Sequence, residues 1–238
     1  PRIREYVQSL RAIWHSWKTG ERLAFEGEHY SFSLMTPNFT PEPMDYSPPP
    51  ITVAAVGPSM LRMAGECCDG VRLHGFCTPR YFHNVIWPEL EAGLAKSGKS
   101  REQFQVSLGG FIVTGATDEE VAKQLNFVRS RIAFYGSTRA YWPVLEQHDL
   151  VDLGEKLNHM SKNNQWREMT AEISDDVIEL FAAIGRHDQL VNEIEKQFGG
   201  LMDVVADSAS YDMPGRLPAD VIQDIQTIKT PFNGFHQE

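Results

Sequence analysis

Cysteine, basic residues and long apolar runs are all scarce in this sequence of 238 residues, and each scarcity argues against a class of protein. The three cysteines are an odd number without CxxC spacing, which argues against a disulfide framework and a zinc site. Lys and Arg number 22 against 32 Asp and Glu, so the chain lacks the basic surface that nucleic acids require. No apolar run approaches the roughly 18 residues of a membrane helix, and the N-terminus is too charged for a signal peptide. We therefore expect a cytoplasmic protein with a small-molecule substrate, and neither a nucleic acid nor a membrane as partner.

Two hydrophobic periods alternate along the chain and predict an α/β fold. The composition, 42% hydrophobic and 23% charged residues, is that of a globular protein. Strand-like apolar runs occupy residues 51–56, 71–76, 104–113 and 201–206. Helical periodicity or capping signals mark residues 1–18, 59–68, 78–97, 117–134, 139–160, 174–185, 187–198 and 219–228. Strands that are apolar on both faces and separated by helices predict a parallel sheet, and four strands are half of a (β/α)8 barrel.

The alternation is interrupted between residues 20 and 50. The sequence RLAFEGEHYSFSL around Gly27 predicts a hairpin or an irregular excursion. Six prolines between residues 37 and 50 then predict an extended connector. At the start of the chain, an apolar stripe at helical spacing is already present from Ile3 onward. We expect further sequence to precede such a helix.

The turn between the first predicted strand and its helix is the best local signal for a ligand. A strand that ends at Gly57 and leads directly into a helix offers unpaired backbone N–H groups and the positive end of the helix, which suit a phosphate. Ser59 adds a hydroxyl donor. The alternative is a plain tight turn in which Pro58 begins the helix. The sequence has neither a Walker nor a GxGxxG pattern here, so the spacing leaves both interpretations open.

Polar and aromatic residues follow two other predicted elements. His74 lies at the carboxyl end of a strand, where a neutral imidazole can donate to a substrate or a cofactor, or can be a satisfied core histidine. Phe76 and Cys77 continue this rim, and Cys77 fits packing better than nucleophilic catalysis. An aromatic break between helices, from Phe134 to Trp142, either covers a flat ring or packs helix on helix. Asp203 lies within the fourth strand, and Asp207 at its end either reaches the pocket mouth or has a capping or turn role.

Several of these segments together resemble a known family. The sequences VAAVGPSMLRMAGECCDGV, LHGF and RIAFYGSTRAYWPVLE resemble the luciferase-like oxidoreductases, in particular the branch that uses the deazaflavin coenzyme F-420. The N-terminal REYVQSLRAIW and FEGEHYSF are similar to the helix and excursion before the fifth barrel strand of that family. The resemblance implies that residues 1–238 form the C-terminal part of one (β/α)8 barrel domain. About four of the eight strands are then present, and residues 20–50 are a non-barrel excursion.

The resemblance also implies roles for individual residues. Ala55, Val56, Gly57 and Pro58 would line the flavin or deazaflavin, while Ser59 and Met60 would face its phosphate end. The rim residues would be His74 as the catalytic residue and Phe76, Phe134 and Tyr135 as substrate contacts. No metal is implied.

The implied function is that of an oxidoreductase that transfers a hydride between F-420 and a small organic substrate. The alternative in the same fold is a monooxygenase with FMN as cofactor. From a different class, the chain would be a non-catalytic half-barrel fragment or an interaction subunit. Because four parallel strands leave open sheet edges, we expect either a homo-oligomer or completion by the missing N-terminal half.

Overall fold

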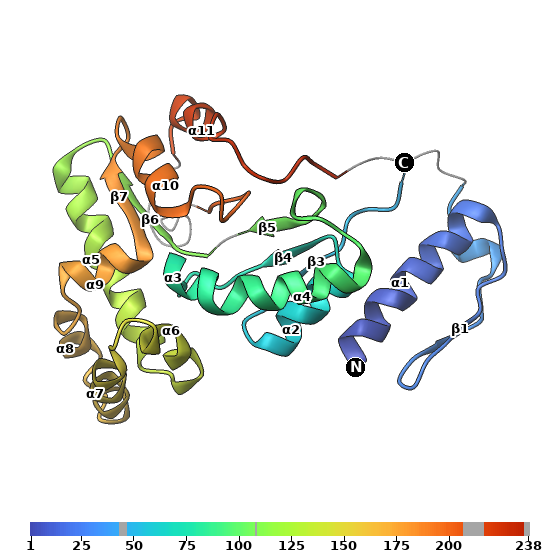
Figure 1. Cartoon of the computed structure of the whole chain (residues 1–238), viewed down its shortest axis with the longest axis horizontal. Helices are drawn as coiled ribbons and strands as arrows, with labels where there is room; N and C mark the ends of the chain where they lie inside the picture. Colours follow the sequence, from blue (N-terminus) through green and yellow to red (C-terminus); the bar gives the residue numbers. More distant parts are fainter. Residues whose placement is uncertain (43–46, 108, 207–216, 236–238) are drawn as a thin grey trace. The chain divides into compact units, whose positions relative to one another are not determined.

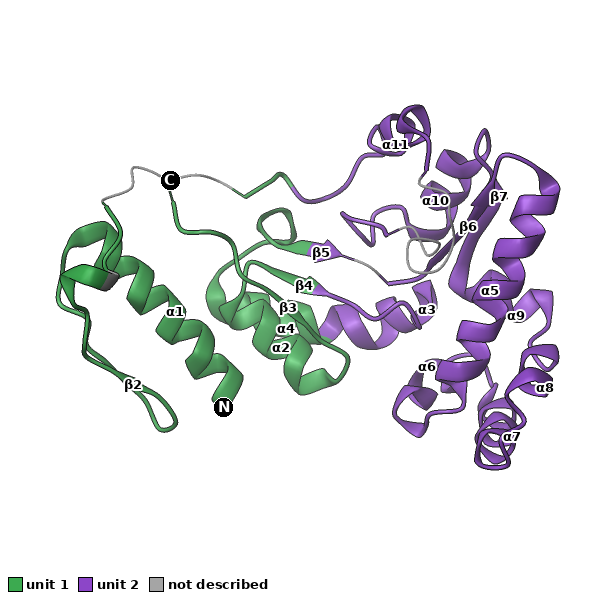
Figure 2. Ribbon diagram, turned by 180° about the vertical axis from the view of Figure 1, so that it is seen from behind, with its two compact units in different colours: residues 1–71, 89–105, 233–238 green, residues 72–88, 106–232 purple. Residues whose placement is uncertain are grey.

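The computed structural model describes residues 1–42, 47–107, 109–206 and 217–235, and Figure 1 shows its helices and strands. Contacts divide the chain into two compact units, coloured separately in Figure 2. The first unit comprises Pro1–Val71, Glu89–Gln105 and Asn233–Glu238. The second comprises Arg72–Pro88 and Val106–Phe232. None of the helices in the described ranges is long and apolar enough to cross a membrane.

The first unit begins with the predicted amphipathic helix. Helix α1 spans Arg2–Thr19 and ends at Gly20, which adopts the left-handed conformation with φ of 75°. Strands β1 (Phe25–Glu26) and β2 (Ser31–Phe32) pair antiparallel, so the prediction of a hairpin is confirmed. A short 3-10 turn, η1, follows at Pro37–Phe39 in the proline-rich connector.

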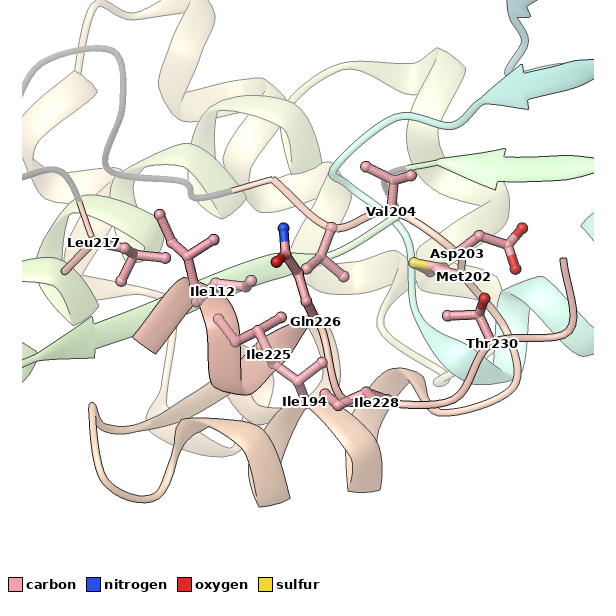
Figure 3. Close-up of a pocket in the computed structure, with 12 residues that line it drawn as sticks. Ile112, Ile194, Met202, Asp203, Val204, Leu217, Ile225, Gln226, Ile228 and Thr230 are labelled. Carbon is pink, nitrogen blue, oxygen red and sulfur yellow. The ribbon is translucent and has the colours of Figure 1, made fainter. Parts of the chain in front are cut away.

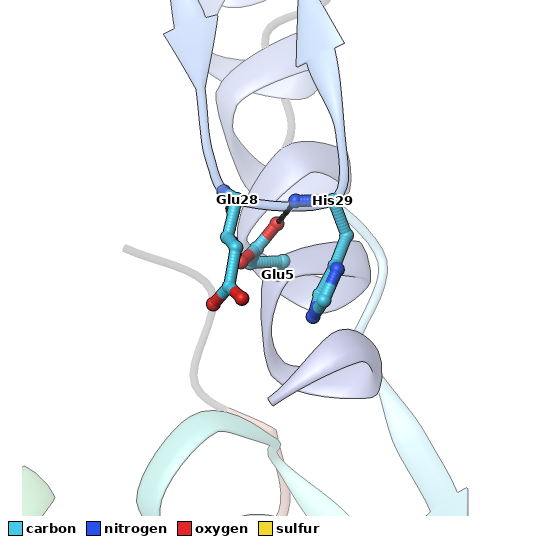
Figure 4. Close-up of side chains that lie close together, drawn as sticks. All are labelled: Glu5, Glu28 and His29. Carbon is cyan, nitrogen blue, oxygen red and sulfur yellow. Dashed lines mark hydrogen bonds between the residues drawn. The ribbon is translucent and has the colours of Figure 1, made fainter.

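A carboxylate of α1 holds the turn of this hairpin (Figure 4). Glu5 accepts hydrogen bonds from the backbone N–H groups of Glu28, His29 and Tyr30 at 3.1, 2.7 and 3.3 Å. The bond from the His29 N–H is the main reason that the pKa of Glu5 is lowered. A Cβ on Gly27 would lie 2.5 Å from a Glu5 carboxylate oxygen, so a side chain there would break the contact. The Glu5 carboxylate, which also lies near the Glu28 and His29 side chains, therefore already serves as a structural anchor.

Strand β3 (Thr52–Ala54), helix α2 (Pro58–Cys67) and strand β4 (Gly70–Arg72) form the first β/α alternation. Helix α4 (Trp87–Ser97), the 3-10 turn η3 (Arg101–Gln103) and strand β5 (Gln105–Ser107) form the next, and the sheet order is β3-β4-β5. The Asp69 carboxylate fixes the turn between α2 and β4. It accepts from the backbone N–H of Ile51 and pairs with Arg11 and Lys99.

The helix predicted at 78–97 exists, with one irregular turn. Helix α3 (Pro79–Tyr81) leads into a π-helical turn, η2 (Phe82–Ile86), and then into α4. Thr78 is the predicted N-cap, because its hydroxyl accepts a hydrogen bond from the Tyr81 N–H.

The second unit contains a parallel strand pair, and here two predictions were wrong. The predicted strand 104–113 is two strands, β5 and β6 (Phe111–Gly115), because Gly109 and Gly110 between them have φ of 123° and 148°. The predicted helix 174–185 ends early: α9 spans Asp175–Phe181, and the chain continues as β7 (Ala182–Arg186). Strand β7 pairs with β6 from Phe111↔Ala182 to Gly115↔Arg186.

The fourth predicted strand, 201–206, is also shorter than expected. Within the described residues it is a parallel bridge between Val204 and Ser107. The α/β class of the prediction is confirmed, whereas the count of four barrel strands is not.

Helices cover the β6–β7 pair and account for most of the second unit. Helix α5 (Asp118–Gly136) begins at the predicted cap Thr117 and packs on β6. Helix α10 (Leu190–Phe198) packs on β7. The unit also contains η4 (Arg139–Tyr141), α6 (Trp142–Glu146), α7 (Val151–Lys162), α8 (Trp166–Ala171) and α11 (Ala219–Ile225), which pack on other helices.

Candidate functional site

The turn between β3 and α2 presents an exposed helix N-terminus, as the sequence predicts. Ala55 is buried, whereas Val56, Gly57, Pro58 and Ser59 are exposed and Met60 is half-buried. Proline at the first helical position has no N–H that would need a partner. The first free donor of the helix is therefore the backbone N–H of Ser59, for which no described residue acts as acceptor.

Gly57 is not required by the backbone conformation of this turn. Its φ of −91° and ψ of 158° suit any residue, and its carbonyl accepts from the N–H groups of Met60 and Leu61. A Cβ built on Gly57 would meet no atom within 4 Å. The N-terminus of α2 is therefore accessible to an anion in the first unit.

His74 lies two residues beyond β4, in the second unit, and its ring is held in one orientation. The backbone N–H of Phe76 donates to Nδ1 of His74 at 3.0 Å. The neutral ring therefore carries its proton on Nε2. Burial lowers the pKa of His74 from its ordinary value of 6.5, which favours this neutral form. No described residue accepts a hydrogen bond from Nε2, so this N–H is available to a ligand.

Two tyrosines flank the His74 ring. Tyr141 stacks on it with a centroid distance of 4.6 Å, and Tyr135 meets it edge-on at 4.5 Å. Tyr135 lies in the last turn of α5, and Tyr141 is the last residue of η4. The aromatic break that the sequence places between helices therefore does contact the candidate catalytic histidine.

The other two predicted substrate residues, Phe76 and Phe134, differ in how far their side chains are exposed. Phe76 is 2% exposed and stacks on Phe181 at 4.6 Å, so its side chain faces the core. Phe134 is 49% exposed and lies beside Trp166. Of the three predicted contacts, Tyr135 meets the His74 ring with its side chain, and Phe76 contacts that ring through its backbone N–H. That these residues bind a substrate stays a prediction.

Of the three remaining candidates, Cys77 and Asp203 are among the described residues. Cys77 is buried, and burial raises its thiol pKa to about 12, which agrees with packing. The Asp203 carboxylate accepts from the backbone N–H groups of Val106 and Phe232 at 2.7 and 3.2 Å. Asp207 lies outside the described residues.

An apolar cavity of about 540 Å³ lies in the second unit beside α10 and α11 (Figure 3). Its lining is mainly aliphatic, including Ile112, Ile194, Met202, Val204, Ile222 and Ile225, and also contains the polar residues Asp203, Gln226 and Thr230. No sequence pattern predicts this cavity, because its lining residues come from separate segments of the chain.

Comparison with known proteins identifies the family. Residues 1–202 match the family described as luciferase-like monooxygenase. The chain belongs to this family. An uncharacterised protein from Mycobacterium tuberculosis is 44% identical over 204 residues, which is 86% of this chain and 60% of the relative. A 5,10-methylenetetrahydromethanopterin reductase from Archaeoglobus fulgidus is 30% identical over 215 residues, or 87% of this chain and 60% of that enzyme.

Solved structures agree on the fold of this luciferase-like chain. The coenzyme F-420-dependent tetrahydromethanopterin reductase from Methanopyrus kandleri superimposes with a TM-score of 0.65 at 20% identity. The match covers 94% of this chain and 60% of that structure. The chain thus spans about three fifths of the length of the proteins it matches. The predicted family is confirmed, and members of it with named activities include F-420-dependent reductases and dehydrogenases.

Proposed function

We propose that this luciferase-like chain belongs to an oxidoreductase that transfers a hydride between coenzyme F-420 and a small organic substrate. Relatives whose names state their cofactor support it, such as an F-420-dependent glucose-6-phosphate dehydrogenase from Nakamurella multipartita that is 32% identical over 123 residues. The observation that carries the proposal is His74: a half-buried neutral imidazole, beyond the end of a strand, with an available Nε2–H between two tyrosines.

Each unit, taken by itself, has residues that suit the binding of a ligand. At the N-terminus of α2, the Ser59 N–H, the Ser59 hydroxyl and the open space before Gly57 suit a phosphate group. Ala55 to Met60 would line the cofactor through their backbone. In the second unit, the Nε2–H of His74 would donate a hydrogen bond to the substrate or to the ring, and Tyr135 would limit the space beside it. When bound, F-420 supplies the hydride chemistry, and the protein supplies binding and orientation.

A second candidate is a monooxygenase that uses FMN. The description of the matching family as luciferase-like monooxygenase favours it. A third, of a different class, is a non-catalytic barrel segment that acts as an interaction subunit. For either enzyme we propose a homo-oligomer, or completion by further barrel strands, as the partner arrangement.

A pair of variants at Gly57 tests the phosphate role by charge alone. Asp and Asn are both good N-cap residues, so Gly57→Asp and Gly57→Asn should fold equally well. A carboxylate about 10 Å from a phosphate costs roughly 1.7 kcal/mol at an effective dielectric of 20. An N-cap side chain at residue 57 also accepts from the backbone N–H of Ser59 or Met60, so both variants should bind F-420 more weakly than the wild type. The added charge should make the Asp variant about 20-fold weaker than the Asn variant, with the difference reduced by salt.

The binding is followed by the absorbance of F-420, with FMN titrated in parallel. Wild-type affinity in both variants would refute the phosphate role of this turn. Preference of the protein for FMN would favour the monooxygenase, and binding of neither compound would favour the interaction subunit.

A further inference from the structure

Two segments of the second unit are joined by side-chain contacts that bracket the candidate catalytic histidine. One segment follows β4 and the other follows α5. The contacts are the ring stack of His74 on Tyr141, a pair between Thr78 and His148 at 2.8 Å, and a hydrogen bond from Asn84 to Gln147 at 3.0 Å. Local sequence does not predict these contacts, because the polar pairs join residues 63 to 70 positions apart.

The Thr78 hydroxyl determines how the pair with His148 is protonated. Thr78 is fully buried, and its oxygen accepts the N–H of Tyr81 as the cap of α3. A hydroxyl has one hydrogen, and no other acceptor for it is present among the described residues. The hydroxyl therefore donates to Nε2 of His148, and the neutral His148 ring carries its proton on Nδ1.

The surroundings of His148 favour this neutral form. Burial lowers the pKa of His148, and the positive charge of Arg80 lowers it further, against an opposing effect of Asp149. A protonated ring would turn Nε2 into a donor and leave the buried Thr78 hydrogen without an acceptor, which is costly.

The chain between Thr78 and His74 is short and hydrogen-bonded throughout. The Cys77 N–H donates to the carbonyl of Gly75, and the Phe76 N–H donates to Nδ1 of His74. A displacement of Thr78 would therefore reach the bond that sets the His74 tautomer.

We propose that His148 is a positioning residue: by accepting the Thr78 hydroxyl at Nε2, it holds the loop that presents His74 against Tyr141. The functional meaning of this arrangement rests on the proposed function, because His74 is the group that would touch the ligand. The structural part does not, and it can be measured without any cofactor.

Histidine-selective NMR on the protein provides the first test. In the wild type we expect the ring proton of His148 on Nδ1 and that of His74 on Nε2. A proton on Nε2 of His148 at neutral pH would overturn the proposal. This measurement needs no variant, so a variant that fails to fold does not leave the proposal untested.

Substitutions provide the second test. His148→Leu removes the acceptor, whereas His148→Gln keeps an oxygen at a similar distance, and His159→Leu makes the same change at an exposed histidine of α7. We expect His148→Leu to shift the His74 ring signals and to raise the Kd for F-420 about tenfold. We expect His148→Gln to restore both, and His159→Leu to change neither.

Unchanged His74 signals in His148→Leu would overturn the proposal whatever the binding result. If the NMR result is as expected but no form of the protein binds F-420, the proposed function fails and the positioning role of His148 stands.

Discussion

Gly93→Ala should push helices α2 and α4 apart, because these helices touch through their backbones. A Cβ on Gly93 would lie 2.2 Å from the carbonyl oxygen of Arg62 and 3.0 Å from the Cα of Gly65. The reverse is also true, since a Cβ on Gly65 would lie 2.5 Å from the carbonyl oxygen of Leu90. Ordinary contacts of a Cβ are 3.4–4 Å, so one helix must move by roughly 1 Å.

The size of the effect follows from two opposing contributions. Overpacking costs about 1–3 kcal/mol, and the upper part of this range applies because the obstructing atoms are backbone rather than the end of a side chain. Alanine in place of glycine inside a helix contributes about 1 kcal/mol in the other direction. The net destabilisation is therefore about 2 kcal/mol, which lowers Tm by roughly 4–8 °C for a chain of this size.

Calorimetry that compares Gly93→Ala with the control Gly136→Ala measures the effect of the backbone contact between α2 and α4. A Cβ on Gly136 in α5 would meet side-chain atoms alone: the terminal Cδ1 of Leu157 at 3.0 Å, and atoms of Phe76 and Leu145 at the ordinary distances of 3.8 and 3.9 Å. This control should therefore stay within about 1 kcal/mol of the wild type. Because α2 also presents the Gly57 turn, Gly93→Ala should weaken F-420 binding as well. A Gly93→Ala protein that melts at or above the wild-type temperature would refute the close approach of α2 and α4.

Three other expectations concern the candidate site. Burial lowers the pKa of His74 below 6.5, so the unfolded chain binds more protons than the folded chain as the pH falls. The free energy of unfolding should therefore decrease below about pH 6.5, by at most ~1.4 kcal/mol per pH unit. In urea unfolding at several pH values, His74→Gln should reduce this slope. Phe76→Ala should destabilise the protein by about 3–5 kcal/mol, because Phe76 is fully buried against Phe181; a loss below 1 kcal/mol in the same assay would contradict its core position. Phe134→Ala should change stability by at most about 1 kcal/mol, because half of the ring is exposed, so a large change in substrate KM would separate binding from packing.

Features that depend on neighbouring residues were predictable from the sequence. The hydroxyls of Thr78 and Thr117 each cap the helix that follows, and each accepts the N–H three residues ahead. The hairpin around Gly27 and the end of α1 at Gly20 follow from turn chemistry in the same way. In each case the residues that make the bond lie within a few positions of one another, so the pattern of the sequence contains the whole interaction.

Strand β7 shows where such reasoning fails. Residues 182–186 (AAIGR) follow the helix signal Ser174-Asp175-Asp176 and contain alanines, so helical periodicity extends through them. They are a strand because β6, about seventy positions earlier, supplies a parallel partner from Phe111 to Gly115. The predicted strand 104–113 was wrong for another reason: Gly109 and Gly110 adopt positive φ and so end one strand before the next begins.

At the candidate site the sequence predicts a histidine at position 74, whereas the chemistry depends on which of its two ring nitrogens carries the proton. His74 beyond a strand end was predictable, but a sequence treats its two ring nitrogens alike. The backbone from His74 to Phe76 turns so that the Phe76 N–H occupies Nδ1, and this bond leaves Nε2–H as the one donor of the neutral ring. The same short loop packs the Phe76 side chain against Phe181. A predicted rim residue thus acts on the candidate site through its backbone N–H, and a pattern of side-chain types in a sequence contains no signal for such a backbone contact.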